Sequence, residues 1–284
     1  AISYERSASI TNCFVNGTLS AGYASGGLIG LAGDGDIVIT DSYTSGEINS
    51  KNIAGGLIGK ATGLVGVGIT IDNSFSLCDV FSTTKSETIG EGDSGSSAAG
   101  GFIGAVFVTR DKSIRINKSF WEGNVVAVSC SGGLIGKSFI GNLATGINKL
   151  TITDCYTAGS VKSVLIKYEG YSRSTYAGGF IGLSLCSLEF FNSFTSCSIV
   201  SDAQETLGSA AYAGGFVAHS DLNGNVSYNE KYDNCFSSGD ISALSYWQSW
   251  AGGFSGFGHI ACITNSHVTG NIDSYCTSPD SATS

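Results

Sequence analysis

The sequence predicts an all-β protein: a parallel β-solenoid (β-helix) of about eight three-stranded rungs, with loop insertions along one edge. A glycine phrase and an aromatic phrase alternate along nearly all of the 284 residues. A third observation is a short run, aliphatic at alternate positions, that leads into several of the aromatic phrases. Self-similarity at a spacing of tens of residues is the signature of a solenoid or another repeat array.

The glycine phrase pairs two glycines with a following Leu or Phe. Its seven copies are SGGLIG (25–30), AGGLIG (54–59), AGGFIG (99–104), SGGLIG (131–136), AGGFIG (177–182), AGGFVA (213–218) and AGGFSG (251–256). Paired glycines permit a positive φ angle or a close approach of two backbones. We therefore expect each copy to form a corner followed by one short strand.

The aromatic phrase has the form Asn or Asp, then Cys or Ser, then an aromatic residue. Its eight copies are ITNCFVNG (10–17), ITDSYTSG (39–46), IDNSFSLC (71–78), INKSFWEG (116–123), ITDCYTAG (152–159), FFNSFTSC (190–197), YDNCFSSG (232–239) and ITNSHVTG (263–270), with Lys118 and His267 among the departures. Strand side chains alternate between two faces. The pattern therefore predicts a column of stacked aromatic residues on one face, about 4.8 Å apart, and small residues with an aliphatic on the interior face.

The Asn and Asp residues of this phrase predict a hydrogen-bonding ladder at a corner, because such side chains bond to nearby backbone and tolerate left-handed conformations. The third segment, as in DIVIT (36–40) and KLTIT (149–153), completes a unit of three strands. Eight stacked units are roughly 38 Å long at the strand spacing. A β-propeller is the alternative, but the first two units, from Asn12 to Asp41 and from Asp41 to Asn73, are too short for four antiparallel strands.

Amino-acid composition indicates which domain organisation and which partners to expect. With 41 Gly, one Pro and 13% charged residues the chain is expected to fold, as one solenoid domain over residues 1–272 and a Ser/Thr-rich tail over residues 273–284. A net charge of −9 argues against nucleic acid as a partner. No apolar run approaches the roughly 20 residues that cross a bilayer, so we expect no direct membrane insertion. The absence of Met suggests a processed or excerpted segment.

Cysteines and glycosylation sequons together predict an extracellular, cell-surface glycoprotein. There are nine Cys, and the sequons are at Asn16, Asn117 and Asn225. Two sets of Cys share columns in rungs that are not adjacent, so we expect them to be buried small residues, since a disulfide needs Cα atoms within about 7 Å. The candidates for disulfides lie outside those columns and are Cys130, Cys186, Cys262 and Cys276.

Chemistry-bearing patterns are few. The three His are far apart in sequence, and no Cys-x-x-Cys or nucleophile motif with the right context occurs. Calcium is the one cofactor considered, because GDGD (33–36) and GEGDSGS (90–96) contain Asp34, Asp36, Glu91 and Asp93. Neither stretch has the spacing of a known calcium loop, which favours solvated turns. We therefore predict no cofactor, no metal and no catalytic activity.

Insertions between the aromatic and glycine phrases gather in residues 79–99, 160–177, 198–213 and 240–251. Stacking places them along one edge, and insertions in solenoids often form the binding face. Tyr and Trp suit interfaces because they bury area and keep a polar atom. The predicted interaction edge consists of Tyr168, Tyr171, Tyr176, Tyr212, Tyr246, Trp247 and Trp250.

The two phrases resemble the GLUG-motif repeats of bacterial and protist cell-surface proteins, which include large adhesins. GGLIG at 26–30, 55–59 and 132–136 fits that motif, as does ITDCYTAGSV (152–161), while Phe replaces Leu in the other four glycine phrases. The resemblance covers nearly all of the chain. It implies a β-solenoid and a surface location, and no particular chemistry.

Two functions are expected from these observations. The first is an extracellular structural or adhesive protein, a subunit or segment of a stalk or filament that self-associates, because both ends of the solenoid read as uncapped and unpaired strand edges recruit further strands. Cys276 is a candidate to lock such a contact. The alternative is a carbohydrate-binding or carbohydrate-active β-helix protein that uses the aromatic loop edge. Glycans and other surface proteins are the further partners considered.

Overall fold

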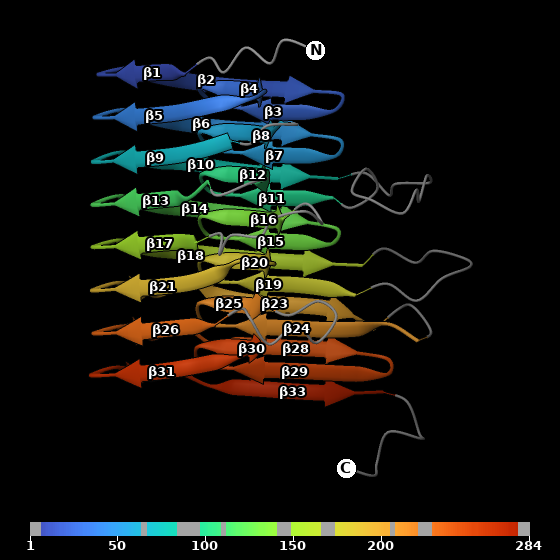
Figure 1. Cartoon of the computed structure of the whole chain (residues 1–284). Coiled ribbons are helices and arrows are strands. Elements are labelled where there is room, and N and C mark those ends of the chain that lie inside the picture. The colour runs from blue at the N-terminus through green and yellow to red at the C-terminus, as the bar shows by residue number, and fades with distance from the viewer. Residues whose placement is uncertain are drawn as a thin grey trace.

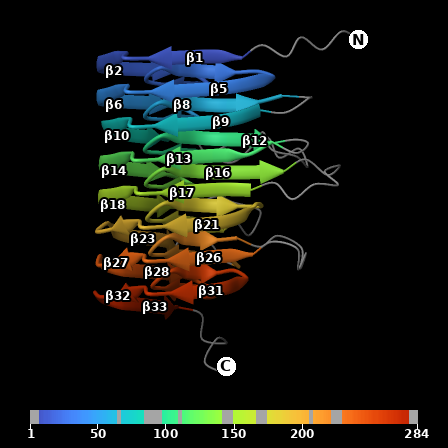
Figure 2. The same ribbon diagram turned by 60° about the vertical axis from the view of Figure 1, so that its left-hand side comes forward.

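The computed structural model describes residues 7–63, 67–83, 97–108, 112–140, 149–165, 174–204, 208–220 and 229–277. Over these ranges the regular structure consists of β-strands, joined in four sheets by parallel pairing. Figures 1 and 2 show the strands of each sheet stacked in sequence order along one rod, from the N-terminus to the C-terminus. The described residues contain no helix long and apolar enough to cross a membrane.

Each rung of the rod contributes to the four sheets in turn, which we name A, B, C and D. Sheet A contains β1 (Ala8–Thr11), β5 (Gly35–Thr40), β9 (Val67–Asp72), β13 (Ile114–Asn117), β17 (Lys149–Thr153), β21 (Ser187–Phe191), β26 (Glu230–Asp233) and β31 (Ile260–Thr264). Sheet B contains β2 (Phe14–Ala21), β6 (Tyr43–Ser50), β10 (Phe75–Ser82), β14 (Phe120–Ala127), β18 (Tyr156–Val164), β22 (Phe194–Thr195), β23 (Ser198–Ala203), β27 (Phe236–Ser237), β28 (Ile241–Ser245), β32 (His267–Val268) and β33 (Ile272–Cys276).

The glycine phrase supplies the other two sheets. Sheet C contains β3 (Ala24–Gly26), β7 (Ile53–Gly55), β11 (Ala98–Gly100), β15 (Cys130–Gly132), β19 (Thr175–Gly178), β24 (Ala210–Gly214) and β29 (Gln248–Gly252). Sheet D contains β4 (Ile29–Ala32), β8 (Ile58–Thr62), β12 (Ile103–Val108), β16 (Ile135–Ile140), β20 (Ile181–Ser184), β25 (Val217–His219) and β30 (Ser255–Phe257).

The predicted parallel β-solenoid is thus confirmed, and each of the first seven rungs passes through four sheets instead of the three predicted. The glycine phrase does not form one strand after a corner. It ends a sheet C strand at its first Gly, turns through its second Gly and the Leu or Phe, and begins a sheet D strand at the next residue, as at Gly55 and Ile58. We call this turn the Gly-Gly arc.

Close approach, not a positive φ angle, is the reason for the paired glycines. A Cβ atom on Gly132 would lie 2.0 Å from the carbonyl oxygen of Ile135 in the same arc, and one on Gly133 would lie 2.0 Å from the oxygen of Gly179 in the next. The arcs also share hydrogen bonds: Leu134 and Ile135 both donate their N–H groups to the oxygen of Phe180, at 2.9 Å. Seven arcs stacked in this way leave no room for side chains.

The corner between sheets A and B carries the positive φ angles instead. The residues in this left-handed conformation are Asn12, Asp41, Asn73, Lys118, Asp154, Asn192, Asn234 and Asn265, with φ between 46° and 54°. Their side chains form the predicted ladder, as Asn192 donates to Asp154 at 3.0 Å and Asn234 donates to Asn192 at 2.9 Å. The next residue, Ser or Cys, adds a second ladder: the Ser74 hydroxyl accepts the Ser42 N–H at 3.1 Å.

The core fills the space that the sheets enclose. The predicted interior aliphatics of sheet B are buried in the middle rungs, where Val80, Val125 and Val161 have 0% exposure. The side chain at the tip of each arc, such as Leu57 or Phe180, joins the same cluster. A second, smaller cluster lies between sheets C and D and includes Ile53, Ala98, Ala105, Cys130 and Leu183.

Insertions occur in two kinds of connection between strands instead of one. Residues 84–96, 166–173 and 205–207 connect sheet B strands to sheet C strands, at the predicted edge. Residues 64–66, 109–111, 141–148 and 221–228 connect sheet D strands to sheet A strands. The solenoid also extends past the predicted boundary at residue 272, because β33 pairs with β28 as far as Cys276. Residues 278–284 of the predicted tail lie outside the described ranges.

The first glycine of an arc tests the close approach. Gly132→Ala should lower the free energy of unfolding by about 3 kcal/mol, because the added Cβ meets a backbone oxygen that cannot move without breaking the arc. Gly22→Ala is the matched control, since a Cβ at Gly22 has no neighbour within 4 Å. Chemical denaturation of both variants measures the difference, and equal loss in the two would contradict the account.

Lys118 tests the corner. It adopts φ 48° where most of the equivalent residues are Asn or Asp, and a left-handed conformation costs an ordinary residue about 1–2 kcal/mol. Lys118→Asn should therefore stabilise the protein by about 1 kcal/mol. Lys162→Asn, at an exposed position of β18, should be neutral or destabilising. Thermal melting of the two variants checks this, and a loss of stability in Lys118→Asn would refute it.

Candidate functional surfaces

The aromatic column on sheet B, which we call the aromatic spine, stacks in two runs, from Phe14 to Phe194 and from Phe236 to His267. It consists of Phe14, Tyr43, Phe75, Phe120, Tyr156, Phe194, Phe236 and His267. Ring centroids are 4.8 Å apart from Tyr43 to Phe75 and 4.6 Å apart from Phe120 to Tyr156, with interplanar angles of 5° and 4°. The rings cover each other's faces, so mainly their edges are presented to the side of the rod.

Three residues of the predicted interaction edge lie in strands instead of loops. Tyr176, Tyr212 and Trp250 occupy one register position of sheet C, stacked with centroids 5.1 Å and 4.6 Å apart. The buried imidazole of His219, from sheet D, meets Tyr212 edge-on at 4.6 Å and stacks on Phe257 at 5.0 Å. These rings fill the layer between sheets C and D, and the sequence did not indicate that the two columns face each other.

The other residues of that edge have different positions. Tyr246 and Trp247 lie in the turn between β28 and β29, and Trp247 is 51% exposed. Tyr168 and Tyr171 lie outside the described residues. The edge is therefore not a single row of exposed aromatic side chains in the part of the chain that the structure describes.

Two lysines are buried in the layer between sheets C and D. The Lys60 ammonium donates to the Tyr23 hydroxyl at 2.8 Å and lies 4.9 Å from the centre of the Phe107 ring. The Lys137 ammonium lies 4.5 Å from the centre of the Phe139 ring. Cation–π contact stabilises a cation out of water, so these side chains complete the packing of the layer.

Glu230 is a buried acid in a column of aliphatic residues. It occupies the position that Leu188 has one rung earlier and is 1% exposed. The Tyr232 hydroxyl donates to its Oε2 at 2.5 Å, the Ser255 hydroxyl donates to its Oε1 at 3.1 Å, and the Ser220 hydroxyl also donates to Oε1. A Cβ on Gly258 would lie 2.0 Å from Oε1, so this glycine makes room for the carboxyl.

Burial raises the pKa of Glu230, while the hydroxyl donors and the charge of His259 lower it. Burial, together with Glu230, raises the pKa of Tyr232 well above its usual value. This network was not predicted from the sequence. The stretch NEKYD (229–233) could have indicated it, because a Glu there interrupts the aliphatic alternation of the third segment. The described part of this network contains a single carboxyl group, whereas a glycosidase pair consists of two.

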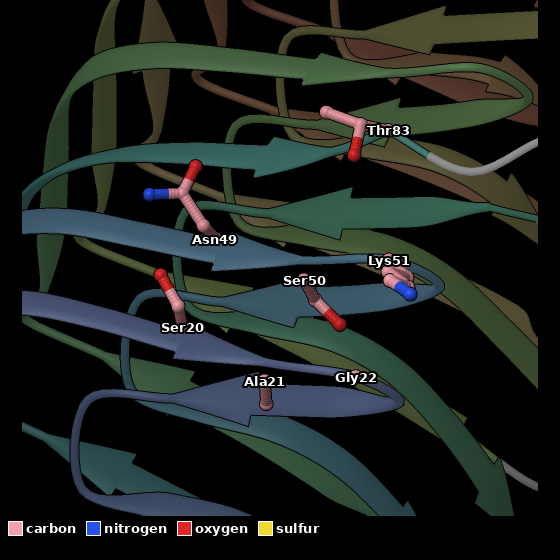
Figure 3. Close-up of a pocket in the computed structure, with 7 residues that line it drawn as sticks. All are labelled: Ser20, Ala21, Gly22, Asn49, Ser50, Lys51 and Thr83. Atoms are coloured by element: carbon pink, nitrogen blue, oxygen red, sulfur yellow. The ribbon is translucent and has the colours of Figure 1, made fainter.

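A shallow hollow of about 410 Å³ lies between the first three rungs at the edge of sheet B (Figure 3). Its lining is mainly polar and consists of Ser20, Ala21, Gly22, Asn49, Ser50, Lys51 and Thr83. Aromatic residues do not line it, and it is open to solvent. No group of three or more metal-ligating side chains occurs among the described residues.

The predicted disulfides do not form. All nine Cys are free thiols, and the four candidates occupy different places round the rung: Cys130 in β15 of sheet C, Cys186 between β20 and β21, Cys262 in β31 and Cys276 at the end of β33. The reason is geometric, because no two of them share a corner or a facing pair of strands. Of the column cysteines, Cys78, Cys155, Cys197 and Cys235 are buried small residues, as expected, whereas Cys13 is exposed because it lies in the first rung.

The described sequons differ in accessibility. Asn16 is exposed on β2, whereas the Asn117 amide donates to Asp72 at 2.6 Å and the Ser119 of its sequon is buried. Asn225 lies outside the described residues. Of the calcium candidates, Asp36 pairs with the Lys112 ammonium at 2.9 Å, Asp34 follows β4, and Glu91 and Asp93 lie outside the described residues.

The C-terminal end of the rod exposes side chains whose columns are buried in the middle rungs, and the N-terminal end exposes the first ring of the aromatic spine. Ile263 and Ile272 of the last rung are 44% and 43% exposed, although they continue the columns of the buried Tyr232 and Ile241. Phe14 begins the aromatic spine and is 65% exposed. Strands at both ends of every sheet pair on one side only among the described residues.

Comparison of the chain with protein-family models, with curated proteins and with solved structures gives no match.

Glu230→Gln tests the buried acid. Because the pKa of Glu230 is raised in the folded state above its ordinary value of 4.5, its stabilising contribution is present at acidic pH and is lost as the pH rises through the folded pKa. Gln keeps an acceptor oxygen and does not titrate. The free energy of unfolding of the wild type should fall relative to that of Glu230→Gln as the pH rises above about 4.5, by about 1.4 kcal/mol for each unit of raised pKa, and the melting temperature should fall with it.

The matched control is Asp273→Asn, at an exposed carboxyl of β33. It should leave the pH dependence of the wild type unchanged. Melting curves from pH 4 to pH 9 on all three proteins measure the effect. Parallel curves for wild type and Glu230→Gln would show that the buried carboxyl does not titrate differently in the folded state.

Proposed function

We propose that this protein is an extracellular structural or adhesive rod that associates end to end through its terminal rungs. The observation that carries the proposal is the exposure, at the C-terminal end, of the same apolar columns that form the core in the middle of the rod, as at Ile263 and Ile272, together with the exposure of Phe14 at the other end. Buried in an end-to-end contact, such side chains would contribute about 25 cal/mol per Å² of apolar surface removed from water.

Register supports a head-to-tail contact between identical chains. The last rung carries His267 in the spine column, Asn265 in the corner column and Ile272 in the interior column, and the first rung carries Phe14, Asn12 and Leu19 in those positions. A second copy placed with β1 against β31 and β2 against β32 and β33 continues sheets A and B without a change of register. Such a heterologous contact does not close and therefore builds a filament.

The contact is expected to be non-covalent. In that register Ser274 faces Ala21 of the next copy, so Cys276, two residues further on, faces Tyr23, and Cys262 faces Ser9, because these positions share columns through the rungs between them. Neither thiol meets another thiol. We therefore no longer expect Cys276 to lock the contact.

The exposed sequon at Asn16 supports a surface location. The stacked rings favour the structural role over carbohydrate binding, because a sugar ring packs on a free aromatic face. From Tyr43 to Tyr156 in the aromatic spine, and at Tyr212 in sheet C, both faces of each ring are covered by neighbouring rings.

Sedimentation velocity and electron microscopy at increasing protein concentration, under reducing conditions, test end-to-end association. The wild type should form rods of increasing length. Ile263→Lys with Ile272→Lys should prevent this, because the contact would bury two unpaired charges. Phe14→Lys, at the opposite end, should do the same.

Leu77→Lys is the matched control, since Leu77 is as exposed as Ile272, at 43%, but lies on the side of the third rung. It should associate like the wild type. Wild-type protein that remains monomeric at every concentration, or that associates side by side and is blocked by Leu77→Lys, would overturn the proposal.

A further inference from the structure

We propose that the C-terminal end of the rod is an acceptor site for one extended strand–arc–strand segment with the chemistry of this chain's own Gly-Gly arcs. This inference rests on the proposed end-to-end association and identifies the segment that would fill the part of the contact where strands are missing. Sheets A and B end at β31 and at β32 and β33, which belong to the eighth rung. Sheets C and D end one rung earlier, at β29 and β30. The end of the rod is therefore a step of half a rung, which we call the notch.

Backbone donors point into the notch. In the six arcs before the last, the second Gly and the two residues after it donate their N–H groups to carbonyl oxygens of the next arc, as Gly215, Phe216 and Val217 do to Gly252 and Phe254 at 2.9–3.0 Å. The equivalent N–H groups of Gly253, Phe254 and Ser255 have no acceptor among the described residues. In the other arcs the last two of these three N–H groups donate to the same carbonyl oxygen. The N–H groups of Phe254 and Ser255 therefore point to the position that one carbonyl oxygen of an added arc would occupy.

Side chains in the notch match the same occupant. Trp250 ends the stacked column of sheet C with Tyr212 on one face. Phe257 ends the facing column of sheet D and is 42% exposed. No strand of the described residues covers the other side of these rings. An added strand of the sheet C type would place a further side chain on Trp250, and its arc would place a Leu or Phe beneath Phe254.

The segment that fills the notch must consist of an arc and its two flanking strands, without strands of the sheet A or sheet B type at the same level. Every other arc of the protein packs against an arc of the same kind, with paired glycines at the point of closest approach. The whole first rung of a second copy cannot enter the notch, because β31 and β33 already fill the sheet A and sheet B positions at that level. In a head-to-tail pair no described strand fills the notch, and a separate strand–arc–strand segment of the repeat type would fill it by strand addition.

A synthetic peptide of residues 175–184, TYAGGFIGLS, provides the test. It places Tyr176 on Trp250, Phe180 beneath Phe254 and Leu183 beside Phe257, by the registers of the internal rungs. The peptide carries a fluorophore and a charged solubilising tag at its amino end, and fluorescence anisotropy measures its binding to the full chain. The control peptide has Gly178→Val, because a Cβ there lies 1.9 Å from the arc's own Ile181 oxygen and prevents the arc from forming.

Saturable binding of the first peptide, at least about tenfold tighter than the control, supports the inference. Trp250→Ala in the protein should weaken binding about fivefold or more by removing the stacked ring, and Trp247→Ala, in the neighbouring turn, should leave it unchanged. No saturable binding, equal binding of the two peptides, or equal loss in the two variants would overturn it. Sedimentation without peptide reports end-to-end association separately, so either proposal can fail alone.

Discussion

The close contact of one Gly-Gly arc with itself and with the next is the constraint on which the rest of the structure depends. Folding sheet D back against sheet C within a single rung brings the first Gly of each arc within reach of the arc's own carbonyl oxygen, where a Cβ atom on Gly100 would lie 2.0 Å from that of Ile103. Glycine loses more backbone freedom on folding than any other residue. All seven arcs carry that cost. It is offset because the carbonyl of the Leu or Phe in an arc accepts two N–H groups from the arc before it.

Once the arcs set the axial rise, every side chain meets its own equivalents one rung above and below. Like residues therefore stack, which explains the aromatic spine, the ladder of Asn and Asp at the corner and the buried hydroxyl pair of Thr157 and Thr195, with oxygens 2.9 Å apart. The same rule explains where the protein departs from its pattern. Glu230 is accommodated in an aliphatic column because Gly258 leaves space and three hydroxyls donate to it. Among the described rungs only those at the ends lack one of their two neighbours, which is why the proposed contacts lie there.

The sequence predicted the features that follow from repetition: the parallel solenoid, the interior column of Ile48 and Val80, the outward aromatic column and the corner ladder. The sequence did not distinguish between the two reasons for paired glycines, because a positive φ angle and a close approach of backbones both select glycine. The arc was therefore predicted as a simple corner, and the fourth strand was missed. The position of Tyr176 and Tyr212 was also misjudged, since residues that follow an insertion look like part of it until strand register is known. Glu230 was missed because its partners, Ser220 and Ser255, belong to another sheet and to a turn beside it. Side-chain contacts between different sheets cannot be predicted from the alternation of residues along one strand.

Site-resolved amide hydrogen exchange by NMR tests the stacked-arc account most directly. The N–H groups of Leu57, Phe102, Leu134, Phe180 and Phe216 each donate to the next arc at 2.9 Å, whereas that of Phe254 has no acceptor among the described residues. The account predicts slow exchange at the central three of these arcs, somewhat faster exchange toward the ends, and fast exchange at Phe254 in the free protein. Protection of Phe254 equal to that of Phe180, or rapid exchange at Leu134, would contradict it.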